Sequence, residues 1–177
     1  MSFIALMAAV MCVVGPIAIP LPVTAVPITF MVFVIYFTVY LLGMKAGMMS
    51  YVSYLLLGFV GLPVFSGFTG GVSKIAGPTG GYLLGFIILI LICGAFAEKF
   101  RGNMKFYIVG MALGLAVAYA LGTAWLAWQS NLSFEAALLA GVIPFLPGDA
   151  VKILAAALMC RPAKKLIARA VNGIMQG

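Results

Sequence analysis

Histidine is absent from this sequence and charged residues are scarce: ten lysines and arginines and three aspartates and glutamates stand among 177 residues. Without histidine, a cysteine or serine nucleophile lacks its most common activating base, which disfavours an enzyme built on such a nucleophile. Cys12, Cys93 and Cys160 lie in apolar stretches, at separations that match no metal motif. We therefore expect no metal, no disulfide framework and no cofactor, and we interpret the cysteines as small buried apolar residues.

Two further absences narrow the function. No stretch matches Gly-x4-Gly-Lys-Ser/Thr, the loop that cradles nucleotide phosphates, so the chain is not expected to hydrolyse ATP by that route. The net charge of +7 is spread over too few cations to form a face that follows phosphates. Nucleic acid is therefore not an expected partner.

What the sequence has in abundance is apolar residues, at 66%. Charged residues, at 7%, fall far below the roughly 25% of a soluble domain. A surface of this composition is stable in contact with a lipid bilayer rather than with water. The length suits one domain, which we take as residues 1–177.

A helix needs roughly 20 apolar residues to cross a bilayer core, and six segments meet or approach that length. Four prolines within residues 15–27 forbid a continuous helix there and favour an extended path. Residues 133–141 favour a short helix at the membrane surface. The expected fold class is all-α, a compact bundle of six transmembrane helices over residues 3–19, 28–43, 46–61, 80–98, 105–128 and 148–168.

Lysine and arginine placement indicates the orientation. If the N-terminus is cytoplasmic, only Lys74 and Lys152 fall on the outer side, together with the acids Glu135 and Asp149. The positive-inside tendency of short loops then predicts that both termini are cytoplasmic. The cations on the cytoplasmic side would be Lys45, Lys99, Arg101, Lys105, Arg161, Lys164, Lys165 and Arg169.

A glycine-rich loop over residues 62–79 is the first candidate for binding. Its glycines permit close backbone approach to a ligand, and its aromatic residues offer apolar contact. Thr79 and Gly80 open a helix, where free N–H groups can meet an anion. The other interpretation is a structural turn that covers the end of the bundle. The length of the loop without secondary structure favours binding.

Asp149 and Lys152 form the second candidate. They are three residues apart and so share one helix face. Ionisable residues at membrane depth usually face the interior or a cavity, which predicts a clamp for a polar ligand. Alternatively, Asp149 is an acid favoured by the helix dipole, with a local lysine partner. Both interpretations stay open from the residues alone.

Small residues recur at helical spacing. Such spacing permits close helix contact, and packing within the bundle is its default explanation. Trp125 and Trp128 fall at the end of a span and favour an interfacial position. The spaced pairs are Ala5 and Ala9, Gly81 and Gly85, and Gly110 and Gly114.

Several of these motifs together resemble the BioY family of biotin transporters. The motifs are Gly61-Leu62-Pro63-Val64-Phe65, Gly70-Gly71, Gly77-Pro78-Thr79-Gly80-Gly81-Tyr82 and Phe145-Leu146-Pro147-Gly148-Asp149-x2-Lys152. The proline loop with Val26-Pro27-Ile28-Thr29 is also similar, and the resemblance covers nearly the whole chain. One departure is Met31, where many members carry glutamine.

The resemblance implies a subunit rather than a whole transporter. BioY proteins are the S components of energy-coupling factor (ECF) importers in the bacterial cell membrane. A transmembrane T component and two ATP-binding-cassette (ABC) ATPases supply the energy. Family members pack on the T component through small residues of the first helix, which correspond here to Ala5 and Ala9.

The implied ligand is biotin, which has a ureido group, an apolar thioether ring and a carboxylate tail. Asp149 would accept the ureido N–H groups, and Lys152 would meet the ureido carbonyl or the carboxylate. The Thr79-Gly80 amides are a second candidate for the carboxylate. The expected ligand-binding set is Phe65, Phe68, Thr69, Gly70, Gly71, Thr79, Gly80, Tyr82, Asp149 and Lys152, with no catalytic residue.

Two alternatives remain. One is a secondary transporter in which Asp149 carries the coupled proton, although the chain is short and shows no inverted repeat. The other is an S component for a different vitamin.

Overall fold

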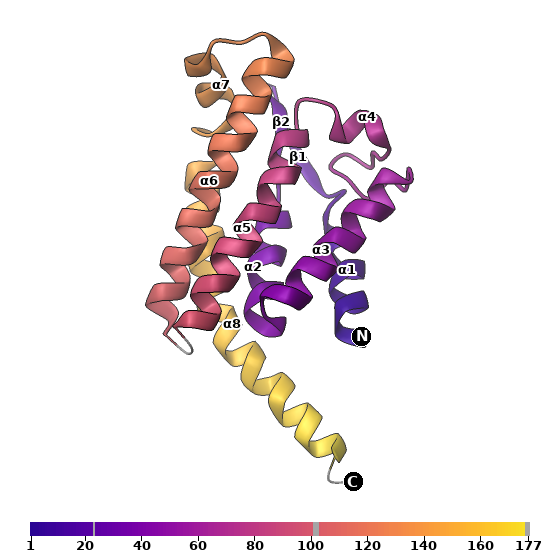
Figure 1. Cartoon of the computed structure of the whole chain (residues 1–177), viewed down its shortest axis with the longest axis vertical. Coiled ribbons are helices and arrows are strands. Elements are labelled where there is room, and N and C mark those ends of the chain that lie inside the picture. Colours follow the sequence, from indigo (N-terminus) through magenta and orange to yellow (C-terminus); the bar gives the residue numbers. More distant parts are fainter. Residues whose placement is uncertain (23, 101–102, 176–177) are drawn as a thin grey trace.

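The computed structural model describes the chain except for Val23, residues 101–102 and residues 176–177. Within the described residues it forms a mostly helical bundle with one β-hairpin (Figure 1). The strands are β1 (Ala18–Leu21) and β2 (Thr24–Thr29). The helices are α1 (Ser2–Val14), α2 (Met31–Leu42), α3 (Met44–Phe59), α4 (Val72–Ile75), α5 (Gly80–Lys99), α6 (Met104–Ser130), α7 (Phe134–Gly141) and α8 (Leu146–Met175).

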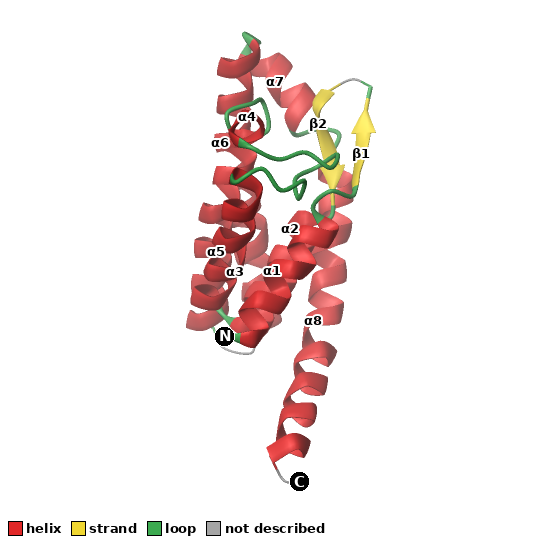
Figure 2. Ribbon diagram, turned by 90° about the vertical axis from the view of Figure 1, so that its right-hand side faces the viewer, coloured by secondary structure: helices red, strands yellow, loops and turns green. Residues whose placement is uncertain are grey.

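The two ends of the bundle differ in kind. The hairpin, α4 and α7 gather at one end together with the long loops (Figures 1 and 2). Both termini lie at the other end, where α8 continues past the remaining helices. Irregular backbone is thus concentrated at a single end.

The proline segment is extended, as predicted, but it also pairs with itself. The helix expected over 3–19 ends at Val14, because Gly15 packs against the Val64 carbonyl and Pro16 cannot donate to a continuing helix. β1 and β2 then pair antiparallel, with an irregular register at Pro20. The all-α expectation is wrong for these residues.

Helices α5 and α6 form the most extensive helix contact of the bundle. Glycines on both helices face the partner helix so closely that an added Cβ atom would be crowded. Gly85 lies against Ala118, and Gly114 lies against Leu89. The packing interpretation of the small-residue spacing is confirmed for this pair of helices.

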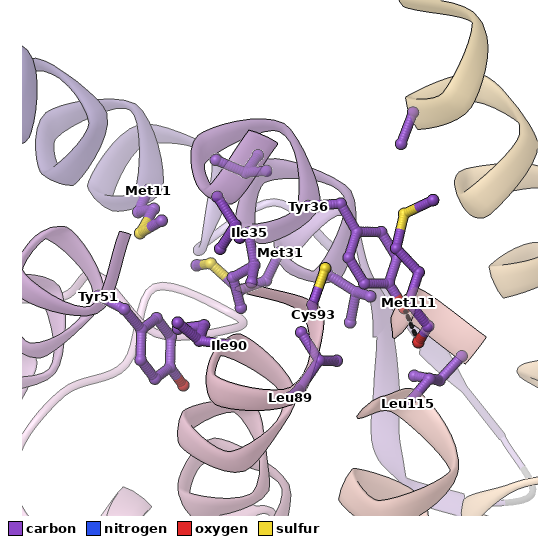
Figure 3. Close-up of a cluster of buried hydrophobic side chains, with 14 of the residues drawn as sticks. Met11, Met31, Ile35, Tyr36, Tyr51, Leu89, Ile90, Cys93, Met111 and Leu115 are labelled. Atoms are coloured by element: carbon purple, nitrogen blue, oxygen red, sulfur yellow. Dashed lines mark hydrogen bonds between the residues drawn. The ribbon is translucent and has the colours of Figure 1, made fainter. Parts of the chain in front are cut away.

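The core combines apolar side chains with tyrosines whose hydroxyl groups are hydrogen-bonded (Figure 3). Tyr36 on α2 donates to the carbonyl of Met111 on α6 at 3.2 Å, and Tyr107 donates back to the carbonyl of Tyr36. These bonds satisfy polar groups that are costly to bury unpaired. Cys93 and Cys160 are buried, as predicted, whereas Cys12 is only partly buried.

Two of the described helices, α5 and α6, are long and apolar enough to cross a membrane. A third candidate arises if α7 and α8 form one span with a bend of 48°. Helices α1 and α2 are apolar but shorter. The fold is therefore that of a helical membrane protein with two or three clear spans, and the count of six stays a prediction.

Glu98 near the end of α5 caps the neighbouring helix. Its carboxylate accepts a hydrogen bond at 3.1 Å from the backbone N–H of Met44, the first residue of α3. α3 begins after Gly43, which has no side chain to cap the helix and adopts a positive φ of 86°. The cap therefore comes from another helix.

We predict that Glu98→Ala lowers the free energy of unfolding by about 1 kcal/mol, the usual cost of losing a helix cap. Glu98→Gln is the matched control, because its amide oxygen still accepts the bond from Met44. Thermal unfolding in detergent micelles measures both variants. Equal midpoints for Glu98→Ala and the unchanged chain would rule out this capping role.

Candidate functional site

A pocket opens at the irregular end of the bundle. Its walls come from β2, the loop after α3, α4, the first turns of α5, the middle of α6, and the junction of α7 with α8. It encloses about 710 Å³, including its open mouth.

The polar centre of the pocket is a buried ion pair. The Lys152 ammonium donates to one Asp149 carboxylate oxygen at 2.6 Å, and the Tyr119 hydroxyl donates to the other at 2.5 Å. Asp149 is 4% exposed and Lys152 8%. The local-partner interpretation of Asp149 is therefore confirmed. Both residues also line the pocket, so pairing and ligand contact are compatible.

Lys74 on α4 is the second cation of the pocket lining. Its side chain is half-buried, and within the described residues no carboxylate forms an ion pair with it. Burial lowers the pKa of the Lys74 ammonium below its usual value. Two lysines against one aspartate leave the pocket with one positive charge in excess, which suits a ligand with a single negative charge.

Aromatic side chains form the apolar wall. Tyr54, Phe65, Tyr82, Phe86 and Phe145 all line the pocket. The Phe65 ring meets the Tyr54 ring edge-on, with ring centres 5.5 Å apart. Tyr82 donates to the Gly141 carbonyl at 3.1 Å and so fixes the end of α7 beside the pocket. A flat apolar ligand body would find large contact areas here.

The glycine-rich loop positions Phe65. Two backbone hydrogen bonds join Phe65 and Thr69, and the Phe65 ring covers Gly58 on α3. Gly70 packs against the Leu62 carbonyl, where a larger residue would collide. Gly71 adopts a positive φ of 90°. Thr69, Gly70 and Gly71 thus shape the loop but do not line the pocket.

Two other predicted ligand residues lie off the pocket. The N–H of Gly80 donates to the Gly77 carbonyl at 3.0 Å, so it is not free for an anion. Gly80 also packs against the backbone of Ile75, which explains the absence of a side chain there. Phe68 is 73% exposed and faces an adjacent groove. The structure brings together Phe65, Thr79, Tyr82, Asp149 and Lys152 from the predicted set.

Sequence reasoning left several polar pocket residues out of the ligand-binding set, and Lys74 and Tyr119 are the two that bear on its charges. Lys74 had a signal, because charge counting placed it at the outer face. Tyr119 had none, because one tyrosine in an apolar helix is ordinary and only packing shows that it reaches Asp149. Met31 is buried at the pocket wall, so that position contributes apolar contact here.

Ala5 and Ala9 lie on α1 outside the pocket lining. Both are exposed, so their spacing does not serve packing within this chain. Trp125 donates to the Gly77 carbonyl at 2.9 Å and so supports the turn between α4 and α5, while Trp128 is 71% exposed.

Comparison with known proteins gives a consistent result. The sequence model of the BioY family matches residues 1–169. The chain is 39% identical over 148 residues to the biotin transporter BioY of Thermotoga maritima, covering 84% of this chain and 86% of that protein. It is 40% identical over 134 residues to the probable biotin transporter BioY of Pyrococcus horikoshii, covering 76% and 78%.

A solved structure supports the same grouping. The crystal structure of the S component for biotin from an ECF-type ABC transporter matches with a TM-score of 0.85 at 29% identity. The match covers 93% of this chain and 89% of that one. Because the family model spans nearly the whole sequence and the relatives match over most of their lengths, the chain belongs to the BioY family.

Proposed function

We propose that this chain is the biotin-binding S component of an ECF-type importer. One observation carries the proposal: a pocket with a buried Asp149–Lys152 pair, an aromatic wall and one excess positive charge lies in a fold that matches an S component for biotin. The chain is a transport subunit rather than an enzyme. Its partners are a transmembrane T component and two ABC ATPases, which hydrolyse the ATP.

The pocket suits the three chemical parts of biotin. Asp149 can accept N–H donors of the ureido group, because each carboxylate oxygen holds more than one acceptor site. Lys152 has three N–H donors and uses one on Asp149, so it can also donate to the ureido carbonyl. The aromatic wall covers the thioether ring. The carboxylate then reaches Lys74, where it supplies the missing anionic partner.

The proposed topology has six crossings, with the pocket on the outer side of a bacterial cell membrane. α1, at about 1.5 Å per residue, is near 20 Å long, which is shorter than the roughly 30 Å of a bilayer core. The end opposite the pocket holds both termini and carries Lys45, Lys99, Lys105, Lys164 and Lys165 (Figure 2). This placement supports a cytoplasmic position for that end. Arg101 lies outside the described residues.

The exposed pair Ala5 and Ala9 supports a partner surface on α1. Small residues four apart let a second helix approach closely, and both alanines are exposed among the residues that the structure describes. We assign this face to the T component.

The purified chain in proteoliposomes is expected to bind biotin without accumulating it, because it has no energy source. Uptake should appear only when the T component, the ATPases and ATP are added. Concentrative uptake by the chain alone, driven by a proton gradient, would instead show a secondary transporter with Asp149 as the coupled carboxylate.

Isothermal calorimetry with the purified chain should show binding of biotin but not of thiamine or riboflavin. Asp149→Asn replaces one acceptor oxygen with an N–H2 donor that opposes the ureido N–H groups, and Lys152→Ala removes the donor to the ureido carbonyl. Each variant should therefore weaken biotin binding by more than about tenfold. Thermal unfolding confirms that each variant is folded. If both variants keep biotin affinity within about twofold, the pair has no direct role in recognition.

The Lys74 ammonium gives the site a pH dependence. Its pKa is lowered by burial, so the free protein loses this charge at a lower pH than an exposed lysine. The biotin carboxylate is ionised throughout the neutral and alkaline range. Affinity should therefore be constant at neutral pH and fall as the pH rises through the lowered pKa of Lys74.

Lys74→Arg is the matched control, because arginine stays protonated above pH 12 or so. Binding titrations from about pH 7 to pH 10 should show that biotin affinity falls with pH for the unchanged chain and falls less for Lys74→Arg. Lys74→Met should bind biotin more weakly than the unchanged chain at neutral pH, and its affinity should fall little further as the pH rises. Identical profiles for all three proteins would exclude Lys74 as the carboxylate partner.

A further inference from the structure

A second hollow adjoins the pocket. This groove lies between the hairpin and the tip of the loop after α3, and it encloses about 980 Å³, including its open mouth. Pro27, Ser66 and Lys74 line both the groove and the pocket. The two hollows therefore adjoin at these residues.

The groove has a defined frame. The N–H of Gly67 in the loop donates to the carbonyl of Pro16 at 3.0 Å, which ties the loop to the segment before β1. Pro20 and Leu21 of β1 line the groove. Its walls are therefore joined by backbone bonding and do not depend on side-chain contact alone.

The chemistry of the groove suits an aliphatic chain. Its lining is mostly apolar, and Lys74 is its only charged member. Phe68 lies at this groove, is 73% exposed and adopts a positive φ of 56°, which is rare for a bulky residue. An apolar chain in the groove would cover this exposed ring and remove its contact with water.

Lys74 connects the groove to the ligand of the pocket. If the ureido group lies at Asp149 and Lys152, the carboxyl end of biotin reaches Lys74, where the pocket opens into the groove. Any group attached through that carboxyl carbon would pass Lys74 and continue between β1 and the loop. The ureido end has no such exit, since Asp149 and Lys152 are buried.

We propose that the groove is a subsite for the alkyl part of biotin amides, in which the carboxyl carbon of biotin is joined to an alkyl amine such as a lysine side chain. In these ligands Lys74 donates to the amide carbonyl, and the alkyl chain lies against Phe68 and the hairpin. The proposal rests on the proposed function and widens its ligand class from free biotin to its amides.

The test compares biotin with ε-N-biotinyl-lysine on the purified full-length chain by calorimetry. The amide should bind no more than about a hundredfold more weakly than biotin, a loss expected when one charge-assisted hydrogen bond becomes a neutral one. Ala18→Trp fills the groove from a residue that lines the groove but is not itself part of the pocket lining. This variant should bind the amide at least about tenfold more weakly than the unchanged chain does. Its affinity for biotin should stay within about threefold of that of the unchanged chain.

Ile19→Trp is the matched control, because Ile19 is the next residue on β1 and does not line the groove. Ile19→Trp should change neither the affinity for biotin nor the affinity for ε-N-biotinyl-lysine. Pro20→Trp is a second groove variant and should reproduce the selective loss. Biotin binding in the same preparation shows that each variant is folded.

The outcomes separate this proposal from the proposed function. Biotin binding without measurable amide binding would overturn the subsite and leave the biotin function intact. Amide binding that Ala18→Trp and Pro20→Trp do not weaken would also overturn it. A groove variant could lose affinity for biotin and for the amide equally while keeping the unfolding temperature of the unchanged chain. That result would place the groove within the biotin site itself and overturn a separate alkyl subsite. Failure of the unchanged chain to bind biotin would instead refute the proposed function.

Discussion

The pocket depends on a buried ion pair whose two members lie on the same helix. Asp149 and Lys152 are held one turn apart on α8, and burying either charge alone would be strongly unfavourable. Their mutual bond, with the Tyr119 hydroxyl from α6, satisfies both carboxylate oxygens. α6 and α8 must therefore keep a fixed distance, and the ammonium of Lys152 retains donors for a ligand.

The remaining walls are positioned by contacts that lie outside the pocket. Tyr82 is fixed by Gly141 on α7, and the Phe65 ring is fixed by Gly58 on α3 and by the backbone bonds of the loop. The glycines here exclude side chains so that an aromatic ring can occupy the space. The glycine-rich motifs thus act mainly through packing, and the ligand-facing surface consists of the side chains that they orient.

The charges define two unequal ends of the site. Asp149 and Lys152 neutralise each other at the buried end. Lys74 is half-buried where the pocket adjoins the groove, and no carboxylate in the described part of the chain forms an ion pair with it. A ligand with neutral hydrogen-bonding groups at one end and a carboxylate at the other matches this asymmetry. Lys74 also lines the adjacent groove, so the proposed carboxylate position lies beside that groove.

Composition and motif order were enough to predict a membrane protein, its family and the pair Asp149 and Lys152. Lipid exposure requires an apolar surface, and a spacing of three residues on a helix fixes a shared face. The extended path of residues 15–27 also followed from the prolines, because they restrict the backbone locally. Pairing into a hairpin did not follow, since it depends on which strands meet.

The tertiary structure alone decided which loop residues line the pocket. Phe65 and Phe68 are three residues apart in similar sequence surroundings, yet one is buried in the pocket and the other is exposed at the groove. Tyr119 and Asp149 are brought together from different helices across 30 positions of sequence. The sequence determined the local chemistry of these residues, because composition and spacing act over a few positions. Their roles were decided by the packing of α6, α8 and the loop, because direction and distance between segments arise only when the chain is folded.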